Sequence, residues 1–345
     1  MSSILYEITK KILFRLDPEN AHELALWGLK KADKLGLSFH KYKCIKDPTS
    51  VMGLHFRNKV GLAAGLDKNG DFINCLQNLG FGFIELGTVT PRPQAGNPKP
   101  RLFRVPESEA LVNRLGFNNK GVDHLISKVK SSKRNSVIGI NIGKNKDTPI
   151  EDAHQDYEHC LRKAYPLADY IAINISSPNT ENLRNLQQRD NLHRLLRHIS
   201  ETRSILQNIH GKFKPIAVKI APDLDNYQIE SIVDAVKTYQ LDGIIATNTT
   251  VQRPDMQLKN LSEPGGLSGG LLTQISTRII EKLANLTQGS IPIIGVGGIV
   301  TPQDALDKIN AGASLVQIYS GLIYSGPKLI KDSAQVISRA EHRSA

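Results

Sequence analysis

The sequence predicts an α/β fold, a (β/α)₈ TIM barrel that follows a small N-terminal extension of two helices. Eight short apolar runs alternate with longer amphipathic segments from about residue 60 to residue 335. Runs that are apolar on both faces are typical of parallel strands covered by helices. Eight such units need about 250 residues, which fits this span. A doubly wound open sheet, which shows the same alternation, is the alternative.

The predicted strands end in small or polar residues. In chain order they are VGLAAG (60–65), FGFIELG (81–87), VIGINIG (137–143), YIAINIS (170–176), PIAVKI (215–220), DGIIATN (242–248), PIIGVGG (292–298) and SLVQIYS (314–320). Periodic segments between them, such as residues 227–239, predict amphipathic helices. Residues 88–136 form a long, basic and proline-rich connection, which we expect to make an excursion over the barrel mouth.

Residues 1–46 differ from the catalytic barrel that we predict over residues 47–345. Ile8, Ile12 and Leu16 recur near helical spacing, and Asp17-Pro18 supplies an N-cap and a first-turn proline for a second helix. Nine lysines and arginines against five acidic residues give this segment a charge of +4. Two short basic amphipathic helices predict either a cap packed on the barrel or an interfacial membrane anchor.

Composition limits the classes of partner. The net charge of +11 and the pI near 9.4 indicate an anionic partner, such as nucleic acid, an acidic membrane surface or anionic small molecules. Three widely spaced cysteines predict neither a disulfide framework nor a metal site, and they suit a reducing compartment. We identify no secretory signal and no run of about 20 apolar residues that could span a bilayer.

Two lysines stand where predicted strands end, the edge at which barrels bind ligands. Lys68 follows the first strand, and Lys219 lies within the fifth. A lysine inside a strand end is costly unless a negative charge compensates it. A reduced flavin would supply such a charge near N1, and an ion pair with Asp223 is the alternative.

Amides and glycines complete this edge. A side-chain amide both donates and accepts hydrogen bonds, so a group of them suits a ligand with amide edges and carbonyls. The asparagines at strand ends and in nearby loops are Asn113, Asn141, Asn174, Asn179 and Asn248. Glycines that follow strands seven and eight, in VGG (296–298) and SG (320–321), predict a phosphate site, with tight turns as the alternative.

Nine segments in series resemble the motifs of the class 2, quinone-dependent dihydroorotate dehydrogenases. They are AAGLDKNG, ELGTVTPRPQAGNPKPRLFR, NRLGFNN, NISSPNT, VKIAPD, ATNTT, GGLSG, IIGVGGI and QIYSG, and the resemblance runs from about residue 4 to residue 330. It implies one FMN per chain and the oxidation of (S)-dihydroorotate to orotate in pyrimidine biosynthesis. The electrons would pass to a membrane quinone, the second substrate.

The resemblance also implies the site residues. Those for FMN are Ala63, Ala64, Gly65, Leu66, Asp67, Thr88, Asn141, Asn174, Lys219, Thr247, Gly269, Gly298, Tyr319 and Ser320. Those for dihydroorotate are Lys68, Asn113, Arg114, Leu115, Gly116, Phe117, Asn174, Asn179, Asn248 and Thr249. Those near the inner end of a quinone tunnel are His22, Arg104 and Tyr319. Alternatively, His22 packs between helices and Arg104 pairs with an acid.

Ser177 matches the catalytic base of this family. It would take the proton from C5 of dihydroorotate while the hydride leaves C6 for flavin N5. Because a free serine is a poor base, amide donors and Lys68 must acidify that proton by polarising the C4 carbonyl. We expect Thr180 to receive the proton next and Phe117 to shield the site.

The resemblance further implies a monomer bound peripherally to the cytoplasmic face of the bacterial inner membrane. Its basic extension would meet anionic lipid, and it would bind no nucleic acid. The alternatives are a soluble FMN barrel enzyme that uses fumarate or NAD, a tRNA dihydrouridine synthase, and an inactive barrel that serves as an interaction module. The soluble FMN enzyme would have a catalytic cysteine at the position of Ser177. The tRNA dihydrouridine synthase would have a catalytic cysteine at a strand end, and none of the three cysteines of this chain lies at a matching strand end.

Overall fold

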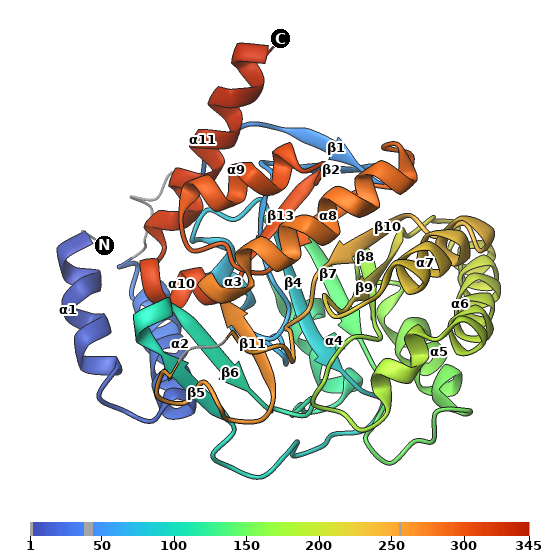
Figure 1. The fold of residues 1–345 in the computed structure, drawn as a ribbon, viewed down its shortest axis with the longest axis horizontal. Coiled ribbons are helices and arrows are strands. Elements are labelled where there is room, and N and C mark those ends of the chain that lie inside the picture. Colours follow the sequence, from blue (N-terminus) through green and yellow to red (C-terminus); the bar gives the residue numbers. More distant parts are fainter. Residues whose placement is uncertain (1–2, 38–43, 255–256, 345) are drawn as a thin grey trace.

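The computed structural model describes residues 3–37, 44–254 and 257–344, and its centre is a closed barrel of eight parallel strands (Figure 1). Around the barrel the strand order is β10-β12-β13-β3-β4-β7-β8-β9. The strands are β3 (Val60–Leu62), β4 (Phe83–Val89), β7 (Val137–Ile142), β8 (Tyr170–Asn174), β9 (Ile216–Ile220), β10 (Gly243–Ala246), β12 (Ile293–Val296) and β13 (Leu315–Ile318). All eight predicted strands are confirmed, and the open sheet is wrong.

Side chains fill the barrel interior at its amino-terminal end. Phe83 and Tyr170 lie there with ring centroids 6.4 Å apart, and Phe56 packs against Phe83 from below. A Cβ added to Gly61 would lie 2.3 Å from the Phe83 ring, and one added to Gly139 would lie 2.1 Å from the Tyr170 ring. Glycine at these two positions therefore makes room for the aromatic layer. Phe56 comes from a hairpin, β1 (Thr49–Val51) and β2 (Leu54–Phe56), near this end.

Helices surround the barrel and bury their apolar faces on it (Figure 1). They are α3 (Ile73–Gln77), α4 (Val122–Ser131), α5 (Ala153–Ala164), α6 (Arg189–His210), α7 (Asn226–Thr238), α8 (Thr273–Thr287), α9 (Pro302–Asn310), α10 (Ser320–Ser325) and α11 (Lys328–Ser344), with 3₁₀ turns η2 (Leu183–Gln187) and η3 (Gly270–Leu272). The helix predicted over 227–239 is confirmed as α7. Its first turn is fixed by a capping box between Asp225 and Gln228.

The connection after β4 makes the predicted excursion and carries strands of its own. β5 (Leu102–Val105) and β6 (Ala110–Asn113), joined by the turn η1 (Pro106–Ser108), form a three-stranded antiparallel sheet with β11 (Gly266–Gly269), which follows β10. The strand order in this sheet is β11-β6-β5. This small sheet lies between the barrel and the N-terminal helices in Figure 1. It therefore separates two regions of opposite polarity, described below.

The two helices predicted in the extension are confirmed as α1 (Ser3–Leu13) and α2 (Pro18–Lys34). The Asp17 side chain accepts hydrogen bonds from the backbone of Glu19 and Asn20, as its N-cap role predicts. Glu19 ties α2 to the excursion through Arg101 (2.7 Å). Within the described ranges, none of the helices has the length and apolarity needed to cross a bilayer. Residues 38–43 of the extension lie outside those ranges.

Candidate functional site

A cavity opens where the barrel strands end, at the edge that the sequence predicts. Its walls come from the turns after β3, β4, β8, β9, β10, β12 and β13 and from the small sheet. The predicted residues that line it are Gly65, Lys68, Thr88, Asn113, Leu115, Gly116, Phe117, Asn174, Ser177, Asn179, Lys219, Thr247, Asn248, Thr249, Gly298, Tyr319 and Ser320. Most residues predicted for the cofactor and the substrate are thus brought together.

Other predicted residues lie around the cavity and do not line it: Ala63, Ala64, Leu66, Arg114, Asp67, Asn141, Thr180 and Gly269. Two have other partners. The Asp67 carboxylate accepts the backbone N–H groups of Asp71 (3.0 Å) and Phe72 (2.8 Å), so it shapes its own loop. Burial raises the pKa of Asp67 to about 6. Arg114 forms an ion pair with Glu263 (2.7 Å).

Glu85, fully buried in β4, organises the polar floor of the cavity. Its carboxylate accepts hydrogen bonds from Asn141 Nδ2 (2.8 Å), the Tyr170 hydroxyl (2.8 Å) and Gln317 Nε2 (2.7 Å). Lys219 Nζ lies 4.0 Å from the same carboxylate. This carboxylate compensates the buried lysine. The predicted alternative was a surface ion pair of Lys219 with an acid such as Asp223. The acid beside Lys219 is instead the buried Glu85, and Asp223 pairs with Arg184.

Burial disfavours the charged form of both lysines of the cavity. Burial lowers the pKa of Lys219, and the charge of Glu85 opposes that shift. Desolvation lowers the pKa of Lys68 to about 8, with the Arg101 charge adding to the effect and Glu19 opposing it. Lys68 Nζ donates to the Gly65 carbonyl (3.0 Å). A bound anion would stabilise the charged form of both groups, so the cavity favours negatively charged ligands.

Small residues form a cradle after β12. Gly298 has a φ of +77°, and a Cβ there would lie 2.3 Å from the Thr273 backbone at the start of α8. The Thr273 hydroxyl donates to the Gly298 carbonyl (2.6 Å), which fixes the turn. Ser268 and Ser320 place their hydroxyl oxygens 2.9 Å apart beside it. This arrangement suits a phosphate group bound by backbone N–H groups and hydroxyls.

The loop after β8 carries Ser177, whose side chain lines the cavity and is 6% exposed. Among the described residues, its hydroxyl has one hydrogen-bond partner, the Asn179 backbone N–H (3.3 Å). The Thr180 and Thr249 hydroxyl oxygens nearby are buried and have no partner there. The site therefore holds unused hydrogen-bonding capacity next to Ser177, as its position in NISSPNT suggests.

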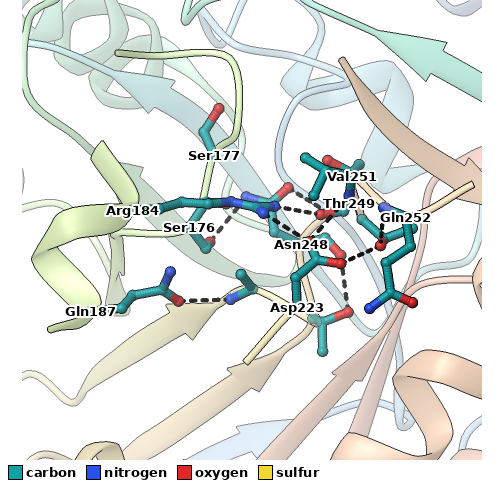
Figure 2. A network of polar contacts seen from close by, with 12 residues as sticks. Ser176, Ser177, Arg184, Gln187, Asp223, Asn248, Thr249, Val251 and Gln252 are labelled. Carbon is teal, nitrogen blue, oxygen red and sulfur yellow. Dashed lines mark hydrogen bonds and ion pairs between the residues drawn. The ribbon is translucent and has the colours of Figure 1, made fainter. Parts of the chain in front are cut away.

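A guanidinium fixes the backbone just before Ser177 (Figure 2). Arg184 donates from Nε to the Ser176 carbonyl (3.0 Å), from Nη2 to the Thr249 carbonyl (2.8 Å), and from Nη1 to the Asp223 carboxylate (2.7 Å). In Figure 2 the Ser177 side chain points away from this guanidinium. Arg184 thus holds the loops after β8, β9 and β10 together outside the cavity.

Sequence reasoning missed Glu85, Gln317, Arg184 and Ser268 as parts of the site. Two of them had a signal: Glu85 and Gln317 are polar residues inside otherwise apolar strand runs, which is expensive unless they are paired. No local sequence signal indicated Arg184 and Ser268, because most of their hydrogen-bond partners lie far away in the sequence. Gln317 Oε1 is buried without a partner among the described residues, which makes it a candidate ligand group.

A second cavity, apolar and about 530 Å³ in volume, lies between α1 and α2. Its walls include Leu13, Ala21, Ala25 and Leu26. Leu102, Leu111 and Tyr319 line this cavity and also the polar one. The two cavities are therefore neighbours that share a wall.

The three residues predicted for a quinone all line the apolar cavity. Burial lowers the pKa of His22 to about 4, and the Lys68 charge adds to the effect, so this imidazole is neutral at pH 7. Arg104 donates to the carbonyls of Leu16 (3.0 Å) and Phe14 (3.3 Å), so it holds the end of α1, and it pairs with no acid in the part of the chain that the structure describes. Burial raises the pKa of Tyr319 to about 12.

Comparisons with known proteins agree on one family. A sequence model described as "Dihydroorotate dehydrogenase" matches residues 48–340. A protein of Methylobacillus flagellatus named "Dihydroorotate dehydrogenase (quinone)" is 53% identical over 339 residues, which cover 97% of this chain and 100% of that protein. A protein of Neisseria meningitidis serogroup C with the same name is 52% identical over 337 residues, 97% of this chain and 98% of that one.

A solved structure agrees as well. The crystal structure of DHODH in complex with ferulenol from Eimeria tenella superposes with a TM-score of 0.86 at 37% identity, covering 95% of this chain and 92% of that one. The relatives match over nearly their whole lengths, and the family model spans the barrel. The chain belongs to the dihydroorotate dehydrogenase family.

Proposed function

We propose that this chain oxidises (S)-dihydroorotate to orotate, with FMN as its cofactor and a quinone as the electron acceptor. The quinone-dependent activity carried by the names of its relatives supports the reaction. The observation that carries the proposal is the shared wall of Leu102, Leu111 and Tyr319, with a polar cavity on one side and an apolar one on the other. A polar substrate and an apolar acceptor would thus approach the same point from opposite sides.

The residues present fit FMN. The Gly298 turn and the Ser268–Ser320 pair suit its phosphate, because glycine at position 298 lets the turn lie against the Thr273 backbone at the start of α8, beside the two hydroxyls. Among the described residues, Lys219 Nζ makes no hydrogen bond and has only the 4.0 Å ion pair with Glu85, so it suits the electron-rich edge of a flavin. The buried, unpartnered Gln317 Oε1 can accept a hydrogen bond from a ring N–H. When bound, FMN supplies the acceptor for the hydride from C6 and passes electrons to the quinone.

Lys68 and the asparagines would bind and polarise dihydroorotate. Lys68 supplies a cation for the carboxylate and the C4 carbonyl region, and Asn113, Asn179 and Asn248 supply amide edges. Asn179 Nδ2 donates to Asn113 Oδ1 (3.0 Å), and Asn248 Nδ2 donates to the Ser176 hydroxyl (3.0 Å). These mutual bonds pre-orient the amides, so little reorganisation is needed when substrate arrives.

Ser177 would act as the base. Its Oγ takes the proton from C5, and its own hydroxyl proton leaves for Thr180 or a water molecule. The buried Thr180 hydroxyl has no partner among the described residues, so its oxygen is free to accept a hydrogen bond from the Ser177 hydroxyl. Phe117, 8% exposed and at the cavity wall, would keep bulk water away. The carbonyl at C4 must be polarised by Lys68 and the amides, because serine alone is a weak base.

The N-terminal helices would receive the quinone and lie on the membrane. Ile8, Ile12, Leu24 and Trp27 on α1 and α2 are exposed, and their helices also carry lysines. Exposed apolar side chains beside lysines suit an interfacial helix on anionic lipid. We place the protein on the cytoplasmic face of the bacterial inner membrane, as a monomer whose residues 1–46 form a membrane-associated extension of the catalytic barrel, 47–345.

An anaerobic experiment tests the proposal. Dihydroorotate is added to the purified protein, the flavin absorbance is followed, and a short-chain ubiquinone analogue is then added. We expect bleaching and then rapid recovery with the quinone but not with fumarate or NAD. Bleaching without recovery by quinone would refute the role of the apolar cavity, and absence of bleaching would refute the substrate.

A further inference from the structure

We propose that His154, Glu158 and His198 form a zinc-binding site on the outer helices of the barrel. His154 and Glu158 are one turn apart on α5, and His198 lies on the neighbouring α6. One potential ligand atom from each residue lies within 4.8 Å of the other two. All three side chains are half-buried, so an ion can reach them. The sequence did not indicate this site, because His198 lies 44 positions from His154 and 40 positions from Glu158.

One hydrogen bond and one ion-pair contact already orient the potential ligands. His154 Nδ1 lies 3.2 Å from the Glu151 carbonyl, so this nitrogen carries the hydrogen and Nε2 keeps a free lone pair. His198 Nδ1 lies 3.1 Å from Glu158 Oε1. The two imidazole rings stack with centroids 4.2 Å apart. The rings and the carboxylate are thus held together before any ion binds.

The donor set favours zinc. Two imidazoles and a carboxylate bind Zn²⁺ in proteins, and three ligands leave a fourth position for water. The cation nearest to the carboxylate among the described residues is Arg162, with Nη2 3.7 Å from Glu158 Oε2, and it can swing into solvent because its side chain is 45% exposed. A bound ion would link α5 to α6 and so stabilise the folded protein.

Calorimetric titration of the FMN-loaded full chain with zinc chloride tests the site. We expect one zinc ion per chain, and an affinity at least about tenfold lower in His154→Ala, His198→Ala and Glu158→Gln. His159→Ala removes an exposed histidine of the same helix and is the matched control, which keeps the wild-type affinity. Zinc at about a hundredfold above the dissociation constant should raise the melting temperature of the wild type by about 3 °C or more.

Two outcomes would overturn this zinc proposal. One is a wild-type chain that binds no zinc at about 100 μM, a concentration at which a site of this kind should be largely filled. The other is an affinity that stays the same in both histidine variants. If His198→Ala folds poorly, His154→Ala still decides, because its side chain lies at the first turn of α5 and is half-buried.

A different observation carries a second inference, which rests on the proposed function: we infer that Arg184 is a positioning residue for Ser177. The Ser176 carbonyl, which accepts from Arg184 Nε, belongs to the peptide unit that contains the Ser177 nitrogen. The same guanidinium holds the carbonyl of Thr249, which also lines the cavity. One planar group therefore fixes the backbone beside the proposed base relative to the loop after β10 (Figure 2).

Asp223 completes this clamp. Its Oδ2 accepts from Arg184 Nη1 (2.7 Å) and from the Val251 N–H (3.1 Å), and its Oδ1 accepts from the Thr250 hydroxyl. The carboxylate thus keeps the guanidinium in plane and anchors the loop after β10. A lysine in place of Arg184 would keep the charge but could not make three bonds in these fixed directions.

Stopped-flow reduction of the full-length holoenzyme by dihydroorotate tests the clamp. In Arg184→Lys we expect the limiting rate of flavin bleaching to fall about 10–100-fold, because misplacement of a reacting group by about 1 Å costs that much. The apparent affinity for dihydroorotate, the FMN content and the rate of recovery with quinone should change less than about threefold. Hydrogen exchange of the backbone amides of residues 177–183 should be faster.

Controls separate this inference from general damage and from the proposed function. Arg189→Lys changes an exposed arginine at the start of α6 and should match the wild type. Asp223→Asn keeps the shape but weakens the ion pair, and its rate should fall between wild type and Arg184→Lys. Bleaching of Arg184→Lys at the wild-type rate would refute the clamp alone. A wild type that dihydroorotate does not bleach would refute the proposed function.

Discussion

The polar cavity at the barrel mouth and the apolar cavity between α1 and α2 share three wall residues and differ in how they are built. Around the polar cavity, a chain of hydrogen bonds runs from Glu85 through Asn141 and Thr88 to Asn174 and fixes these four side chains. Around the apolar cavity, the helices are held by a few contacts, chiefly Arg101–Glu19 and Arg104 with the end of α1. Proton and hydride transfer need fixed geometry, whereas an apolar substrate needs room and an entrance.

The comparison predicts that damage to each cavity affects a different half-reaction. Changes at the mouth should slow reduction by dihydroorotate and spare reoxidation by quinone. Changes at the helices should do the reverse. A variant at one cavity that slows both half-reactions equally would contradict this separation.

The largest effect is expected from Ser177→Ala. Loss of the proposed base should slow bleaching of the flavin by dihydroorotate by about 10²–10⁴-fold, because general base catalysis contributes that much. FMN content and reoxidation by quinone should stay as in the wild type. Ser204→Ala, at an exposed serine of α6, is the control. Bleaching of Ser177→Ala at the normal rate would remove Ser177 from the chemistry.

The next effect is expected from Arg101→Met. This change leaves the Glu19 carboxylate buried with only Lys99 (3.5 Å) as a partner, and it should lower the free energy of unfolding by about 3 kcal/mol in urea titrations. The quinone half-reaction should lose more rate than the dihydroorotate half-reaction, because α2 loses its anchor. Equal losses in both half-reactions would contradict the separation of the two cavities.

The same ion pair should respond to acid. Burial alone would raise the pKa of Glu19, but hydrogen bonds and charge from Arg101 outweigh it, and the pKa is lowered from 4.5. A lowered carboxyl pKa means that the stabilisation is present above pH 4.5 and is lost as the pH falls through the folded-state value. Arg101→Met should therefore be less sensitive to acid than the wild type when unfolding free energies are compared between pH 6 and pH 3.5.

A smaller effect concerns Lys68, whose pKa of about 8 makes its charge dependent on pH. The ammonium is present below pH 8, so the affinity for orotate, an anion, should be highest there. Above pH 8 the affinity should fall by up to about tenfold per pH unit. Calorimetric titration of the holoenzyme with orotate between pH 7 and pH 9 measures this. In Lys68→Met the affinity should be lower and its slope flatter, and an unchanged slope would assign the titration to another group.

The smallest effect is expected at Gly28, which lines the apolar cavity and has no atom within 4 Å of an added Cβ. Gly28→Phe should narrow the cavity and raise the KM for quinone about fivefold, on the order of 1 kcal/mol of binding. Reduction by dihydroorotate should not change. Gly28→Ala is the matched control, and it should stabilise α2 by about 0.5–1 kcal/mol without affecting the KM. Slower reduction in Gly28→Phe would show that the cavities are coupled through their shared wall.

Much of the fold could be predicted from local sequence patterns. Each barrel strand is apolar on both faces, and this pattern is contained within a few consecutive residues. All eight strands could therefore be identified from the sequence. The predicted runs extend beyond several strands, as at β10, which ends at Ala246 before Thr247 and Asn248 turn into the cavity. Strand ends that point to one edge also explain why most predicted site residues meet there.

The site contains residues that no local pattern could reveal. Arg184 contacts carbonyls 8 and 65 positions away and a carboxylate 39 positions away, and these meet only because β8, β9 and β10 are neighbours in the closed barrel. The zinc-site candidates on α5 and α6 meet for the same reason. The glutamate of β4 was visible in the sequence, but its three partners come from β7, β8 and β13.

The sequence by itself determined the barrel, the two N-terminal helices and the row of polar residues at the strand ends, because periodicity and strand-end chemistry are encoded within a few residues. The tertiary structure alone decided that the polar and apolar cavities share Leu102, Leu111 and Tyr319. These residues come from the small sheet and from the turn after β13, more than 200 positions apart. Packing of distant segments, which local patterns do not encode, brings them together.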